Sequence, residues 1–227
     1  IESALRESSP QIFIKILKHC GALAVILPEV DKLYGVPQPP KYHPEIDTGI
    51  HTLMALQQAA ILSPDPVVRF AALMHDVGKG AIPKTMWPNL RGHEALGVDL
   101  INSACKRLKA PNDFRDLARL TSLHHTHCHR AASHSAEELL ETLEQTDAFR
   151  KPERFGQFLL ACEADSRGRL GLEDVPYPQP GILNKAFSAS ANVDSSVFIE
   201  QGYKNAQIGE QIRLKRLTLI QEALEIS

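Results

Sequence analysis

Several features that mark other classes of protein are missing from this chain of 227 residues. No apolar run approaches the roughly 20 residues that a membrane-spanning helix needs, and no secretory leader is recognisable. With a net charge of −2, the chain has no global field that would draw it onto nucleic acid or a membrane. The few cysteines show no CxxC spacing, which favours reduced intracellular thiols over a disulfide framework; they are Cys20, Cys105, Cys128 and Cys162.

What is present indicates a folded helical protein. Hydrophobic residues make up 43% of the chain and charged residues 23%, values that are ordinary for a globular domain with a real core. Apolar residues recur at helical spacing, and the alternating pattern of strands is nearly absent. We therefore expect an all-α fold. Because the chain begins with Ile1 rather than methionine, we also expect it to be cut from a longer protein.

Capping signals predict where the helices begin. Each predicted start carries a residue that favours an N-cap, a proline, or both, and Ser135 also has a glutamate three positions on. These starts are Ser9-Pro10, Asp47 or Thr48, Asp65-Pro66, Gly92-His93, Pro111, Ser135 with Glu138, and Pro152. A loop rich in proline and glycine, 171–181, predicts a boundary before a separate pair of helices, Ile182–Ile226.

The pair His75-Asp76, within Leu-x-His-Asp-x-Gly-Lys, is the most informative motif. Neighbouring residues in mid-helix point about 100° apart and seldom share a metal ion. At the end of a helix, the following glycines would let the backbone turn so that both side chains reach one ion. Imidazole and carboxylate together suit a divalent ion that can produce hydroxide from water near neutral pH.

Further histidines and aspartates occur on successive predicted helices. Each of them alone is better explained by capping or solvation. The ordered set is a credible hydrolytic metal site, because two histidines and two aspartates leave coordination positions open for water and a phosphate oxygen. The set is His51, His75, Asp76, His124 or His125, and Asp147.

This order, together with Val77-Gly78-Lys79 after the pair, resembles the HD superfamily of metal-dependent phosphohydrolases over about residues 48–149. The resemblance implies that the metal ligands are His51, His75, Asp76 and Asp147. It implies that catalysis involves Asp76, Lys79, His93, His124 and His125, with the histidines holding a second metal or contacting phosphate. Lys79 would place a positive charge beside the phosphoryl group, or would be a solvated loop residue.

Two alternatives concern neighbouring residues. Asp165 competes with Asp147 as the last ligand, and Asp147 is preferred because it lies on the first helix after the histidines. The cluster between His124 and His129, with His134 beyond, has no spacing of a structural zinc site. We expect most of these histidines to be polar loop residues.

A second resemblance covers nearly the whole chain. It is similar to bacterial CCA-adding enzymes in Phe13–Leu17, Gly21–Leu23, Leu27–Val30, His43-Pro44-Glu45-x-Asp47, Asp147–Phe155, Ala164–Arg169 and Ile208–Glu210 with Arg213. This resemblance implies a helical connector at 1–47, an HD phosphohydrolase domain at 48–149 and a C-terminal helical extension at 150–227. The nucleotidyltransferase part would lie before Ile1.

The same resemblance implies a cytoplasmic enzyme of tRNA maturation and repair, acting at the tRNA 3′ end. Implied activities are phosphatase, 2′-nucleotidase and 2′,3′-cyclic phosphodiesterase, on nucleotide or cyclic-phosphate substrates, with Ni²⁺, Mn²⁺ or Mg²⁺ as cofactor. Other hypotheses are a non-catalytic tRNA-binding and oligomerising module, for example a homodimer, and a hydrolase of signalling nucleotides. Among several short basic patches, we expect Arg213, Lys215 and Arg216 to contact RNA, although such residues also solvate helix faces.

Overall fold

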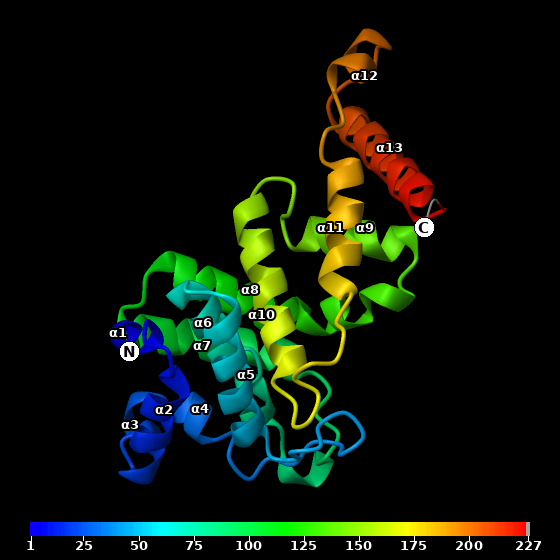
Figure 1. The fold of residues 1–227 in the computed structure, drawn as a ribbon. Helices are drawn as coiled ribbons and strands as arrows, with labels where there is room; N and C mark the ends of the chain where they lie inside the picture. The colour runs from blue at the N-terminus through cyan, green and yellow to red at the C-terminus, as the bar shows by residue number, and fades with distance from the viewer. Residues whose placement is uncertain (226–227) are drawn as a thin grey trace. The chain divides into compact units, whose positions relative to one another are not determined.

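The computed structural model describes residues 1–225 (Figure 1). Within that range it contains thirteen α-helices and three 3₁₀-helices, and its only extended pairing is an isolated bridge between Pro37 and Asp47. The all-α prediction is therefore confirmed. None of the described helices is long and apolar enough to cross a membrane. The helices are α1 (Glu2–Leu5), α2 (Pro10–His19), α3 (Leu23–Ile26), α4 (Pro28–Asp31), α5 (Thr48–Leu62), α6 (Pro66–Met74), η1 (Val77–Ala81), η2 (Lys84–Met86), α7 (His93–Leu108), α8 (Asn112–Arg130), η3 (Ala131–Ser133), α9 (Ala136–Gln145), α10 (Pro152–Arg167), α11 (Gln179–Ser190), α12 (Ser196–Glu200) and α13 (Ala206–Glu225).

The chain forms two compact units, each built from two stretches of sequence. Unit 1 comprises Ile1–Thr126 and Gly156–Tyr177; unit 2 comprises His127–Phe155 and the described residues from Pro178 onward. These limits differ from the segments expected from sequence, because the predicted segment 48–149 is divided between the two units.

Three of the capping signals act as predicted, whereas Ser9, at the start of α2, makes no side-chain capping hydrogen bond. Asp47 accepts a hydrogen bond from the Ile50 amide (3.0 Å) at the start of α5, and Asp65 accepts one from the Val67 amide (2.9 Å) at the start of α6. Ser135 and Glu138 form a reciprocal capping box at the start of α9. The predicted starts of these helices are confirmed.

Helix α6 forms the centre of unit 1, and every residue from Pro66 to Met74 is buried. It packs along α5. Ala59, Ala72 and Ala164 cluster where α5, α6 and α10 meet, and their small side chains permit close packing. Gly168 extends this close approach, because a Cβ added to it would lie 2.5 Å from the Ala55 amide nitrogen. The end of α10 is thereby held against α5.

Two predictions about helices were wrong. Helix α8 does not end at His124–His125 but continues to Arg130, so the histidine cluster is helical rather than part of a loop. The reason is that residues 112–130 contain neither proline nor glycine. After the 171–181 loop there are three described helices, α11, α12 and α13, rather than two. The predicted end at Ile226 lies outside the described residues.

Candidate metal centre

Four histidines from four helical elements of unit 1 are buried together. His51 lies in the first turn of α5, His75 follows α6, His93 begins α7 and His125 lies on α8. Their residues are only 0%, 1%, 7% and 3% exposed, respectively. Because a buried polar ring is costly unless it is paired, this arrangement requires partners for eight ring nitrogens.

One nitrogen of each ring forms a hydrogen bond with a backbone carbonyl. The Nδ1 atom lies within hydrogen-bonding distance of a carbonyl in all four cases: His51 of Gly168 (3.1 Å), His75 of Ala72 (2.8 Å), His93 of Leu90 (2.8 Å) and His125 of Thr121 (3.0 Å). A carbonyl only accepts, so each ring in its neutral form carries its hydrogen on Nδ1 and has its electron pair on Nε2. Such second contacts are typical of histidines that bind metal ions.

The Nε2 atoms converge on two aspartates. Asp165 Oδ1 lies 2.9 Å from His51 Nε2 and 3.5 Å from His75 Nε2. Asp76 Oδ2 lies 3.1 Å from His75 Nε2, whereas its Oδ1 lies 3.3 Å from His93 Nε2 and 3.7 Å from that of His125. Two ligand groups result, His51–His75–Asp165 and Asp76–His93–His125, each with its ligand atoms within 4.8 Å of one another. The two oxygens of Asp76 face one group each.

The donor set fits a divalent cation. Three buried atoms here lack a hydrogen-bond partner among the described residues, namely His75 Nε2, Asp76 Oδ1 and His93 Nε2. Each of the three can offer an electron pair to a cation, His75 Nε2 once its proton has been displaced. They belong to both ligand groups, and a cation in each group would satisfy them.

The electrostatics of the site depend on the same carboxylates. Burial lowers the pKa of His75, but the charges of Asp76 and Asp165 outweigh it and raise that pKa to about 10. Burial raises the pKa of Asp76, yet His75 and Lys79 hold it well below its ordinary value. Burial holds the pKa of His125 well below its ordinary value, so this ring is neutral, the form in which imidazole binds metal.

Lys79 is part of the site. It is buried, and its Nζ donates to Asp76 Oδ2 and to Gln38 Oε1, both at 2.6 Å. The alternative of a solvated loop lysine is wrong. Gly78 also has a different role from the one expected: its φ is not positive, and a Cβ there would collide with the backbone carbonyl of His93. The glycine permits close approach to α7 rather than a turn.

The structure places Asp165, rather than the preferred Asp147, in a ligand group. Asp147 lies in unit 2 after α9, where its carboxylate contacts Arg154 (3.3 Å) and Arg150 (3.5 Å). Asp165 instead lies on α10, whose end returns to α5 and so reaches His51. Of the two adjacent histidines, His125 joins a ligand group and the half-buried His124 does not.

Sequence reasoning missed three contributors to this site. Gly168 contributes its carbonyl to His51, Gln38 holds Lys79, and Glu45 Oε1 lies 3.0 Å from His51 Nδ1. The motif His43-Pro44-Glu45-x-Asp47 was an available signal for Glu45. Gln38 and Gly168 act through contacts that no spacing in the chain reveals.

The proposed RNA patch does not form a free basic surface. In unit 2, Arg213 pairs with Glu137 (2.5 Å) and Glu144 (3.2 Å) on α9, and the guanidinium of Arg216 lies 3.5 Å from the centre of the Phe149 ring. Lys215 is exposed. Two of the three residues expected to contact RNA therefore have partners within unit 2.

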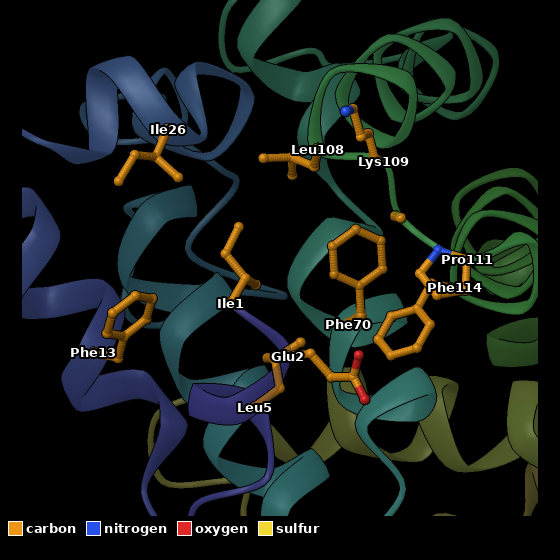
Figure 2. A pocket seen from close by; sticks show the side chains of 11 residues that line it. Ile1, Glu2, Leu5, Phe13, Ile26, Phe70, Leu108, Lys109, Pro111 and Phe114 are labelled. Atoms are coloured by element: carbon orange, nitrogen blue, oxygen red, sulfur yellow. The ribbon is translucent and has the colours of Figure 1, made fainter.

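A separate apolar cavity of about 450 Å³ lies in unit 1 near Ile1 (Figure 2). The rings of Phe70 and Phe114 meet edge to face at its wall, with centroids 5.6 Å apart. Glu2 and Lys109 are the charged residues in its lining. Its lining includes none of the residues of the two ligand groups described above.

Comparison with known proteins agrees with this geometry. Residues 48–154 match the HD domain family. It is also similar over nearly its whole length to proteins named multifunctional CCA protein: 49% identical over 226 residues to that of Teredinibacter turnerae, 49% over 222 residues to that of Thioalkalivibrio sulfidiphilus, and 50% over 220 residues to that of Pseudomonas fluorescens. These alignments cover 97–98% of this chain and 54–55% of the relatives, so the chain spans about half of their length. The resemblance to CCA-adding enzymes seen in the sequence is thus confirmed.

Proposed function

We propose that this chain is a metal-dependent phosphohydrolase that acts on phosphomonoesters and 2′,3′-cyclic phosphates at nucleotide or RNA ends. The observation that supports it best is the convergence of four Nε2 atoms on Asp76 and Asp165, with every Nδ1 held by a carbonyl. A site built only for stability would not leave buried ligand atoms without partners.

His51, His75, Asp76 and Asp165 would hold one ion, and His93 and His125 with the other oxygen of Asp76 would hold a second. A bound divalent ion supplies Lewis acidity for a phosphoryl oxygen and lowers the pKa of a coordinated water. Four imidazoles favour a transition-metal ion such as Ni²⁺ or Mn²⁺ over Mg²⁺, which prefers oxygen ligands.

The protein's own groups prepare the site for this chemistry. Lys79 places a positive charge 2.6 Å from Asp76 and balances part of the negative charge of the two carboxylates. This lowers the repulsion that an anionic phosphate would meet. Burial of the ligand atoms excludes bulk water and strengthens each of these charge interactions.

The experiment measures hydrolysis of para-nitrophenyl phosphate and of 2′,3′-cyclic AMP after chelation and re-addition of Ni²⁺, Mn²⁺ or Mg²⁺. We expect turnover that disappears with chelation and returns best with Ni²⁺ or Mn²⁺. Unchanged turnover after complete metal removal would refute the proposal. In the whole protein, we propose that the substrate is the tRNA 3′ end, in keeping with the relatives called multifunctional CCA protein.

A further inference from the structure

Glu45 lies in the loop between Val36 and Asp47, just before α5. Its side chain is only 2% exposed although it carries a carboxylate. Oε1 lies 3.0 Å from His51 Nδ1 and 3.1 Å from His43 Nδ1, and Oε2 accepts a hydrogen bond from the Leu170 amide at 3.2 Å. Both carboxylate oxygens thus have partners: Oε1 contacts the two histidines, and Oε2 accepts from the backbone that follows α10.

The loop that carries Glu45 is itself held in place. The Gln38 amide donates to the Ile46 carbonyl (2.8 Å), and the Thr48 hydroxyl donates to the Val36 carbonyl (2.9 Å). The side chain of Gln38 also accepts from Lys79 within the metal centre. Glu45 is therefore placed beside His51 by a fixed backbone.

The position of Glu45 matters because it contacts Nδ1 of His51, the ring nitrogen opposite the ligand atom Nε2. The single hydrogen on His51 Nδ1 has two acceptors within reach, the Gly168 carbonyl at 3.1 Å and Glu45 Oε1 at 3.0 Å. A carboxylate beside this N–H draws the hydrogen toward itself and makes the opposite nitrogen, Nε2, a stronger electron donor. His75, by contrast, has a backbone carbonyl at this position.

We propose that Glu45 is a positioning residue of the metal centre, which orients His51 with Nε2 toward Asp165 and strengthens it as a ligand. This inference rests on the proposed function. It concerns a residue outside the region that matches the HD domain, since that region begins at residue 48.

Binding of Mn²⁺ and Ni²⁺, measured by calorimetry on the chelator-treated chain, tests the proposal. The variant Glu45→Gln keeps the shape and an oxygen for the Leu170 amide but removes the charge; we expect its affinity for both ions to fall about 10- to 100-fold. Glu45→Asp keeps the charge on a shorter stem, and we expect it to retain more affinity than Glu45→Gln. Glu7→Gln, at an exposed position of unit 1, is the matched control for loss of one charge and should bind like the unmodified chain.

The rise in unfolding temperature on adding Mn²⁺ provides a second measurement that does not depend on turnover. It should shrink in Glu45→Gln and be unchanged in Glu7→Gln. Equal affinity of Glu45→Gln and the unmodified chain would overturn the role of Glu45 while the metal site stands. A larger loss in Glu45→Asp than in Glu45→Gln would also overturn it, because a purely steric role depends on side-chain length. If the unmodified chain bound neither ion, the proposed function itself would fail.

Discussion

Replacing Asp165 with asparagine separates the observed site from the one expected from sequence. Asp165 contributes one of the three ligand atoms in its group, at 2.9 Å from His51 Nε2 and 3.5 Å from His75 Nε2. Asparagine has nearly the same shape but no charge, so the first ion would be left with two imidazoles and a shared carboxylate. We expect a loss of at least about 100-fold in metal-dependent turnover, or roughly 2.7 kcal/mol.

Asp147→Asn is the matched control. Asp147 has φ +57°, a conformation that asparagine tolerates, and its carboxylate makes only part-exposed contacts with Arg150 and Arg154. Such ion pairs contribute about 0–1 kcal/mol, and none of them involves the site. Turnover of 2′,3′-cyclic AMP by Asp147→Asn should therefore stay within about threefold of normal. Near-normal turnover by Asp165→Asn, or an equal loss in both variants, would refute the assignment of Asp165.

Three further predictions concern the pH dependence and the packing around the site. His75 has a folded-state pKa raised from 6.5 to about 10, so its protonation stabilises the metal-free chain fully below pH 6.5 and this stability is lost as the pH rises toward 10. A metal ion displaces that proton, so calorimetric affinity for Mn²⁺ should increase up to about tenfold per pH unit between pH 6.5 and 8.5; a flat profile would contradict the role of His75. Gly168→Ala should lower the free energy of unfolding by about 1–3 kcal/mol, because the new Cβ would lie 2.5 Å from the Ala55 amide, whereas Gly156→Ala, with open space around it, should not. Arg69→Met should lower it by about 3 kcal/mol or more in urea unfolding, because this buried guanidinium donates to four backbone carbonyls at 2.7–3.1 Å; a change below 1 kcal/mol would show that water replaces it.

The amino-acid sequence by itself determined the helical class, most helix starts and the centre of the site. Asp47, Asp65 and the Ser135–Glu138 pair act within three residues of their own position, so local chemistry suffices to predict them. His75-Asp76 is equally local, because both residues end the same helix. The absence of proline and glycine from residues 112–130 was a readable signal that α8 continues through the histidine cluster.

Tertiary structure alone decided which distant groups complete the site. Asp165 and the Gly168 carbonyl reach His51 across more than 100 residues, and they do so because Gly168 lets the end of α10 approach α5. Asp147 is nearer in sequence to the other ligands, but it lies in unit 2 with arginine partners of its own. Arg213 and Arg216 form a basic patch in the sequence. Only the structure shows that Arg213 pairs with glutamates of α9 and that Arg216 lies over the Phe149 ring. Contacts between segments far apart in the chain depend on how helices pack, and packing is set by the shapes of many side chains at once rather than by the spacing of a few.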